Sequence, residues 1–272
     1  MSDELIYLYC FREKTESPPF SAQGVDGKGE VFSIPARGLE AIVSKVSSEE
    51  FDSETVQIKA REDPNWIKEK ALAHEKVIEE AMRKDDNFLS LIPIRFGTIF
   101  KEEAGLKKTL DKDYSKIEQV LEKIRGKQEW SVKVYLKDKG KFEQAIKKGN
   151  PAIKEKEKEI TSLPEGMAFF MEEELKELVS QEAEKEINNI AESIFESLKK
   201  HTANSARNKI LKKELTGRRE PMVLNAAYLV AEEKIEDFRK GIEDLNQKMQ
   251  VRGFCLEYSG PWPAFNFTQL AD

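Results

Sequence analysis

The side chains of this sequence that could carry out chemistry are few and far apart. It contains two histidines, His74 and His201, which excludes a metal site built from several histidines. His74 precedes Glu75, but Ile78 occupies the fourth position after it, so the HExxH pattern of zinc proteases is absent. We interpret His74 as a structural residue on a helix face, with a ligand or general-base role as the alternative. His201 follows two lysines and suits a helix end.

The cysteines and the glycine-rich stretch have simple structural interpretations. Cys10 and Cys255 lie in strand-like segments and form no CxxC motif, so we expect reduced, buried thiols without a functional role. The stretch GVDGKGE places Gly24, Gly27 and Gly29 in a GxxGxG spacing, and no GK[ST] follows. We therefore predict a turn there and not a phosphate-binding loop.

Charged groups suggest one position for a binding site. The 51 acidic residues include no pair in an apolar setting that would raise a carboxyl pKa for acid-base catalysis. Arg95, in IPIRFGTIF, is a lone arginine in an apolar, β-rich segment, and its head group needs a partner. We expect a buried ion pair that joins sheet to helix, with an anion site as the alternative. No cofactor and no metal are expected.

Composition narrows the class of partner. Charged residues make up 35% of the 272 positions, above the usual ~25%, and the net charge is −6. Lysines alternate with acids and do not cluster, so we expect no nucleic-acid partner. The first residues lack the basic region of a signal peptide, and no apolar run approaches ~18 residues. The expectation is a cytoplasmic protein with no membrane partner.

The first half of the chain interleaves strand and helix patterns. Apolar spacing of three and four predicts helices over 65–83 and 102–124, and Pro93 restricts its strand to an edge or a strand start. These patterns predict an α/β sandwich domain over residues 1–137. The predicted strands are 4–11, 31–34, 39–46, 88–100 and 129–136.

The second half begins with helices and ends in a small mixed part. Asn150 can cap a helix that starts at Pro151, and a long helix follows from about residue 167 to 201. We expect a helical hairpin or coiled-coil-like arm over 138–202. The segment 203–272 then predicts a strand hairpin around TGRREP, an amphipathic helix, the strand FCLEYSG and an extended tail. The overall class is α+β.

Several segments together resemble the GvpF/GvpL family of gas vesicle accessory proteins. LIYLYCF, GVDG, GLEAIVSKV, AHEKVIEE, IPIRFGTIF and EWSVKVYL follow that family's N-terminal order, and NAAYLV and SGPWPAFNF match its C-terminal half. The resemblance covers nearly the whole chain. The family's ending is commonly Pro-Trp-Pro-Pro-Tyr-Asn-Phe, and Ala264 and Phe265 replace its third proline and its tyrosine here.

The resemblance implies two α/β domains, the C-terminal one ferredoxin-like, and a role in assembling a gas-filled protein organelle. The implied partners are the major gas vesicle shell protein and other gas vesicle accessory proteins, met in the cytoplasm in association with the vesicle. The family brings no catalytic residues. We therefore expect a non-enzymatic binder that acts as a minor component or an assembly chaperone. The alternative is a small-anion or nucleotide-binding enzyme with a cleft around Arg95 and His74.

The segment SGPWPAFNF is apolar and incompatible with a helix. Its two prolines favour an extended path that loses little further entropy on docking. We expect its three aromatic residues to be buried in a groove of the protein's own surface between the two domains. A peptide that binds a partner is the alternative. The candidate interaction or domain-clasp residues are Arg95, Phe96, Trp262, Phe265 and Phe267.

Overall fold

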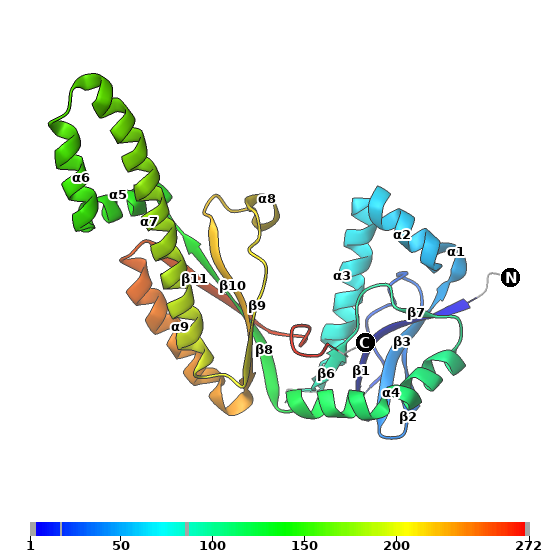
Figure 1. The fold of residues 1–272 in the computed structure, drawn as a ribbon. Coiled ribbons are helices and arrows are strands. Elements are labelled where there is room, and N and C mark those ends of the chain that lie inside the picture. Colours follow the sequence, from blue (N-terminus) through cyan, green and yellow to red (C-terminus); the bar gives the residue numbers. More distant parts are fainter. Residues whose placement is uncertain (1–3, 17, 85–86, 270–272) are drawn as a thin grey trace. The chain divides into compact units, whose positions relative to one another are not determined.

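The computed structural model describes residues 4–16, 18–84 and 87–269 (Figure 1). The chain divides into two compact units, one formed by Met1–Glu129 with Pro261–Asp272 and one by Trp130–Gly260. This division differs from the predicted ranges 1–137, 138–202 and 203–272. The long helix shares a core with the last strands of the chain, whereas the C-terminal segment packs with the first unit.

The first unit is built on an antiparallel sheet in the order β2-β3-β1-β6, with β7 also paired to β1. Four helices accompany the sheet, and β4 and β5 form a separate ribbon. The strands are β1 (Glu4–Glu13), β2 (Val31–Ala36), β3 (Leu39–Ser47), β4 (Arg83–Lys84), β5 (Asn87–Phe88), β6 (Leu91–Pro93) and β7 (Ile99–Phe100). The helices are α1 (Ser48–Phe51), α2 (Ser53–Glu62), α3 (Pro64–Ala81) and α4 (Glu103–Ile124).

The core of this unit forms where α3 and α4 bury their apolar faces on the sheet. Val77 and Ile78 of α3 pack with Tyr7 and Tyr9 of β1, and all four side chains are buried. Helix α4 contacts β1, β2 and β6 and buries its own apolar stripe. The predicted helices and the strands over 4–11, 31–34 and 39–46 are confirmed, because the burial stripes follow the periods that predicted them.

The continuous strand predicted over 88–100 is wrong. The segment contains three short strands, of which β6 and β7 both pair with β1. Between them, residues 94–98 leave the sheet, and Gly97 takes a positive φ of 81°. The chain stays anchored on both sides, because Ile94 N–H donates to Tyr9 O and Leu8 N–H donates to Thr98 O. An apolar, β-rich composition does not reveal such an outward loop.

Helices α1 and α2 had no counterpart in the sequence prediction. Their capping residues carry the signal that was available. The Ser47 side chain accepts a hydrogen bond from Glu49 N–H, and Asp52 accepts from Glu54 and Thr55 N–H. A side-chain oxygen at the N-cap satisfies backbone donors that the first helical turn leaves free.

The second unit has a sheet in the order β11-β8-β10-β9, in which β9 and β10 are antiparallel. Strands β8 and β11 run across the boundary between the units in sequence. The strands are β8 (Lys127–Leu136), β9 (Asn204–Arg207), β10 (Met222–Ala231) and β11 (Phe254–Trp262). The helices are α5 (Lys139–Gly149), α6 (Pro151–Thr161), α7 (Glu165–Lys199), α8 (Lys213–Thr216), the 3₁₀ turn η1 (Glu232–Lys234) and α9 (Ile235–Gln250).

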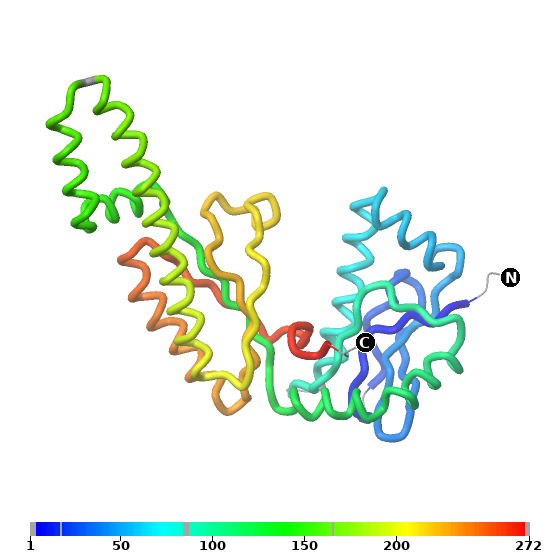
Figure 2. The backbone as a smooth tube through the Cα atoms, viewed as in Figure 1, coloured from blue at the N-terminus to red at the C-terminus, as the bar shows by residue number. Residues whose placement is uncertain are grey.

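Helices α7 and α9 cover this sheet, and the first half of α7 forms a hairpin with α6 (Figure 2). The hairpin has its own small core of Ile153, Ile160, Leu175 and Val179. The Asn150 side chain accepts from Ala152 N–H, so the predicted cap of the helix at Pro151 is confirmed. Among the residues that the structure describes, no helix is long and apolar enough to cross a membrane.

Candidate functional site

The loop of residues 94–98, which carries Arg95, is held to the core of the first unit through His74. Tyr7 Oη donates to His74 Nδ1 over 3.1 Å, and His74 Nε2 donates to Ile94 O over 3.0 Å. A carbonyl oxygen only accepts, so the ring carries its proton on Nε2. Gly97 N–H donates to Tyr7 Oη over 2.9 Å, which closes the chain of hydrogen bonds. His74 thus holds the loop directly at Ile94 and, through Tyr7, at Gly97.

His74 has the structural role that we predicted, at a buried position. Burial lowers the pKa of His74 to about 4, partly offset by the hydrogen bond to Ile94 O, so the ring is neutral near pH 7. Both ring nitrogens are engaged in the protein. No lone pair or N–H group of this ring is left for a ligand, and a cleft that uses His74 together with Arg95 has no support in this geometry.

The two candidate residues in the loop differ in exposure. Phe96 is half-buried, and its ring stands edge-on to those of Tyr7, Trp66 and His74. Arg95 is exposed, and within the described part of the chain it forms no ion pair. The prediction of a buried ion pair at Arg95 is therefore wrong. The loop turns the Arg95 side chain outward, and Phe96 takes the inward position.

The buried ion pair that joins sheet to helix belongs to Arg12. Its Nε donates to Glu40 Oε1 over 2.7 Å, and its Nη1 donates to Ala81 O at the end of α3. The side chains of Arg12 and Glu40 are each 3% exposed. The predicted strand over 4–11 stopped one residue before Arg12. An arginine that continues a buried strand pattern was the available signal.

The glycine-rich stretch forms a hydrogen-bonded turn, as predicted. Gly24 N–H donates to Gly29 O, and Asp26 Oδ1 accepts from Gly29 N–H. Gly27 takes a positive φ of 77°, which favours glycine. The turn is fixed to the core because Val25 N–H donates to Tyr9 Oη. Its amide groups are thus used within the protein.

Both cysteines are free thiols, as expected. Cys10 is fully buried in β1, and this burial raises its pKa to about 12, so the thiol stays protonated near pH 7. Cys255 is half-buried in β11, so the expectation of a buried thiol is confirmed for Cys10 and wrong for Cys255. A protonated, inaccessible thiol at Cys10 is a packing group and not a nucleophile.

The C-terminal segment docks on the first unit through Glu129. Asn266 donates to this carboxyl group twice, from its backbone N–H over 3.0 Å and from Nδ2 over 2.6 Å. The Glu129 side chain is buried, and loss of hydration raises its pKa to about 7, although the bonds from Asn266 act in the opposite direction. Thr268 is also buried and donates to Ala264 O. Polar contacts between Glu129 and Asn266 therefore fix the segment.

The three aromatic residues of this segment have different environments. Phe265 is half-buried and packs against the first-unit core, and Phe267 is half-buried. Trp262 is 42% exposed, so the prediction that all three aromatic side chains are buried is wrong for Trp262. Strand β11 ends at Trp262, and residues 265–267 form a turn in which Phe267 N–H donates to Ala264 O. The prediction of an extended tail is therefore wrong beyond Trp262, and the turn directs Phe265 toward the core. The role of these residues as an interaction site stays a prediction.

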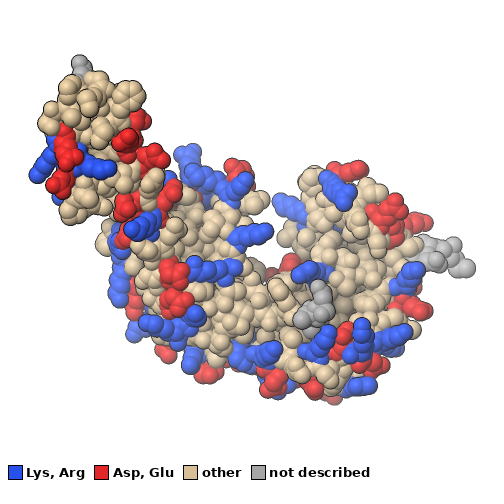
Figure 3. All heavy atoms as spheres, in the orientation of Figure 1, with Lys and Arg blue, Asp and Glu red and all other residues tan. Residues whose placement is uncertain are grey.

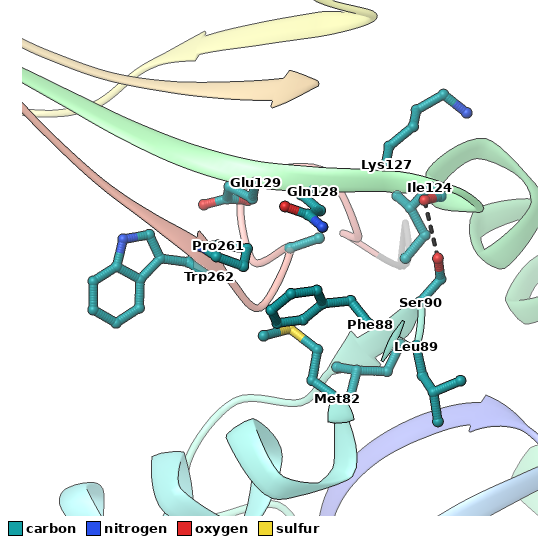
Figure 4. Close-up of a pocket in the computed structure, with 12 residues that line it drawn as sticks. Met82, Phe88, Leu89, Ser90, Ile124, Lys127, Gln128, Glu129, Pro261 and Trp262 are labelled. Carbon is teal, nitrogen blue, oxygen red and sulfur yellow. Dashed lines mark hydrogen bonds between the residues drawn. The ribbon is translucent and has the colours of Figure 1, made fainter. Parts of the chain in front are cut away.

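A small pocket lies beside the docked segment (Figure 4). Its walls include Met82, Phe88, Ile124 and Pro261, and the indole of Trp262 points away from Phe88 and Met82. The pocket volume is about 20 Å³, enough for one water molecule and too small for a nucleotide. This pocket is a packing gap between the docked segment and the unit beneath it.

The structure defines the protein as an α+β chain with two antiparallel sheets, which is the fold of solved GvpF proteins. The crystal structure of GvpF from Anabaena sp. PCC7120 superposes with a TM-score of 0.70 at 20% identity, over 99% of this chain and 98% of that one. The GvpF structure from Microcystis aeruginosa gives a TM-score of 0.66 at 20% identity, over 97% of this chain and 99% of that one.

Sequence comparison identifies the family. Residues 5–269 match the family described as gas vesicle synthesis protein GvpL/GvpF, and this chain belongs to that family. Gas vesicle protein L of Streptomyces sp. (strain CB03234) is 22% identical over 273 aligned positions, covering 100% of this chain and 95% of that protein. Gas vesicle protein F of Nostoc sp. (strain PCC 7120 / SAG 25.82 / UTEX 2576) is 27% identical over 201 positions, covering 74% and 77%.

Proposed function

We propose that this chain is a non-enzymatic accessory protein that binds the small hydrophobic shell protein of gas vesicles and supports vesicle assembly. The observation that carries the proposal is the match of residues 5–269 to a family that is described as gas vesicle synthesis protein GvpL/GvpF. The engagement of both His74 nitrogens within the protein supports a binding role over catalysis. The alternative role is that of a purely architectural vesicle component. Fractionation distinguishes the two roles, because a transient assembly factor is depleted from washed vesicles and an architectural component is retained.

The physical need for such a binder follows from the shell subunit. A small hydrophobic protein that polymerises exposes apolar faces and strand edges before assembly, and these surfaces aggregate in water. A partner that covers them must offer apolar surface of its own. Trp262 is suited to this role, because 42% of its large apolar side chain is exposed. We propose Trp262 and Arg95 as contact residues for the shell protein, in the cytoplasm at the vesicle.

The second unit fits the proposed ferredoxin-like description. Its elements follow the order strand, helix, strand, strand, helix, strand if α5, α6 and α8 are counted as insertions, and the sheet order is β11-β8-β10-β9. This is the element order of a split β-α-β arrangement. We propose that the arm formed by α5, α6 and the first half of α7 is an addition to that framework.

Co-expression with the shell protein tests the proposal. The full chain should co-purify with the shell protein at low and moderate salt, and Trp262→Ala should reduce the recovered shell protein several-fold. Leu72→Ala is the matched control, because Leu72 is a 62%-exposed apolar residue of the same unit. Lack of co-purification of the wild-type chain would refute the binding role. Equal losses in both variants would refute the assignment of Trp262.

A further inference from the structure

The tip of the helical hairpin in the second unit exposes large apolar side chains. Met167, Phe169 and Phe170, in the first turns of α7, are 59%, 62% and 72% exposed. Neighbouring Ala168 and Met171 pack toward the hairpin core, so the exposed three are not needed to hold α6 and α7 together. The rings of Phe169 and Phe170 meet edge to face with centroids 5.9 Å apart. On the face that Figure 3 shows, the described residues at the end of the hairpin are uncharged, and charged side chains gather below them.

Acidic residues follow this apolar tip directly. Residues 172–177 contain four glutamates and one lysine, Lys176, whose Nζ pairs with Glu173 over 2.7 Å. The glutamates are exposed on the helix. We call Met167–Glu177 the acidic tip. A surface of exposed aromatic rings next to several carboxylates fits a partner that offers apolar side chains among cations.

The connection between β9 and β10 in the same unit has that composition. Residues 208–221, between the two strands, contain five cationic residues and two acids, Glu214 and Glu220, in a chain whose net charge is −6. Ile210 and Leu215 are 51% and 74% exposed there. We call this segment the basic loop. Within the described part of the chain, no ion pair involves the exposed residues Lys209, Lys212, Lys213 and Arg219.

Side-chain and backbone contacts hold both ends of the basic loop. Asn208 N–H donates to Asn225 O, and Asn225 Nδ2 donates to Lys209 O over 2.8 Å. At the other end of the loop, the Arg218 guanidinium lies over the Tyr135 ring at 4.2 Å and pairs with Glu257. Little ordering entropy is therefore lost when a partner docks on the loop.

The acidic tip and the basic loop do not meet within one chain. In Figure 1, the connection that carries α8 lies well away from the end of the hairpin where α7 begins. The two surfaces are complementary in charge and both carry exposed apolar side chains, and both belong to the second unit. A second copy can satisfy such a pair. When only one tip and one loop meet in each contact, the contact is heterologous and leaves a tip and a loop for further copies.

We propose that this protein self-associates head to tail, the acidic tip of one copy docking on the basic loop of the next. The inference is independent of binding to the shell protein. In sedimentation equilibrium, the apparent molecular mass of the wild-type protein should increase with protein concentration. Raising the salt from 50 to 500 mM should weaken this association several-fold, because exposed charges are screened.

Two interface variants and two matched controls test the contact. The tip variant combines Phe169→Ser and Phe170→Ser and removes the exposed aromatic rings. The loop variant combines Lys209→Glu, Lys212→Glu and Lys213→Glu and reverses the charge of the basic loop. Each variant should stay monomeric. Leu72→Ser is the control for an exposed apolar change. Lys108→Glu, Lys112→Glu and Lys123→Glu on α4 are the control for charge reversal at exposed positions. Both controls should associate as the wild type does, and circular dichroism should show that all variants are folded.

Mixing the two interface variants decides the geometry. A tip variant retains an intact loop and a loop variant retains an intact tip, so an equimolar mixture should form a one-to-one dimer that does not grow further. A mixture that stays monomeric would overturn head-to-tail docking. A wild-type chain that remains monomeric at hundreds of micromolar in 50 mM salt would overturn self-association altogether.

Discussion

At the scale of single residues, the first unit depends on buried polar groups whose partners lie far away in sequence. Arg12 illustrates this, because its guanidinium links Glu40 on β3 to the last turn of α3. His74 similarly joins Tyr7 of β1 to Ile94 in the outward loop. A buried donor or acceptor that loses its partner costs about 1–3 kcal/mol, and a buried charge costs more.

Arg12→Met should lower the free energy of unfolding of the first unit by about 3–5 kcal/mol, because Glu40 is left buried without its partner. Urea denaturation measures this change. Lys45→Met is the matched control in the same sheet, since Lys45 and Glu4 form an exposed pair, and it should cost less than about 1 kcal/mol. Arg12→Met combined with Glu40→Leu should recover most of the loss. Similar losses at Arg12 and Lys45 would contradict this account.

Glu129 should make stability depend on pH. Its pKa is about 7 in the folded protein against an ordinary value of 4.5, so the folded state binds the proton more tightly. The resulting stabilisation is complete below pH 4.5 and is lost as the pH rises through 7, by about 3 kcal/mol. Urea denaturation at pH 5 and pH 8 measures the free energy of unfolding of the wild type and of Glu129→Gln. The difference between the two proteins isolates the effect of Glu129, because His74 titrates in both. A difference that does not change with pH would rule it out.

At the scale of elements, the C-terminal segment combines a docked part and an exposed part. Phe265 packs on the first-unit core and Asn266 bonds to Glu129, whereas Trp262 remains 42% exposed. The backbone is extended as far as Trp262 and turns at residues 265–267, so Trp262 and Phe265 lie in different surroundings. The aromatic residues of one short motif therefore serve different purposes.

Phe265→Ala should lower the free energy of unfolding by about 2 kcal/mol, because it removes a half-buried ring. Trp262→Ala should change it by less than about 1 kcal/mol, since a large part of that side chain already contacts water. Thermal unfolding of both variants measures the contrast. A larger loss for Trp262→Ala than for Phe265→Ala would show that the tryptophan is the docking residue.

At the scale of the whole molecule, the second unit interrupts the sequence of the first. Residues 1–129 and 261–272 contact one another and form the first unit, and residues 130–260 form the second unit. Glu129 and Pro261, at the two ends of the interruption, line the same pocket. A chain that leaves a unit and returns to it at nearby points can be closed by a short linker.

Replacing residues 130–260 with a short Gly/Ser linker should leave a first unit that unfolds cooperatively, because its core and the bonds between Asn266 and Glu129 are retained. Residues 1–129 alone should melt at a lower temperature, since the docked segment is missing. Differential scanning calorimetry compares the two proteins. If the linked protein has no cooperative transition, or melts no higher than 1–129, the division of the chain is different.

The amino-acid sequence by itself determined most helices and strands, because each buries one face and the period of its apolar residues reveals that face. It also determined the cap at Asn150, the turn at Gly27 and the family, since these depend on local residue types. The apolar period did not predict helices α1 and α2. They are short, and only their caps at Ser47 and Asp52 indicate them.

Only the tertiary structure decided which charged and aromatic residues turn inward. Arg95 and Arg12 both stand in apolar strand-like segments, yet a loop carries Arg95 out to water while β1 carries Arg12 between Glu40 and α3. Phe265 and Trp262 differ in the same way within one motif. Such choices depend on partners 28 to 137 positions away, and the spacing of neighbouring residues contains no information about groups that only folding brings together.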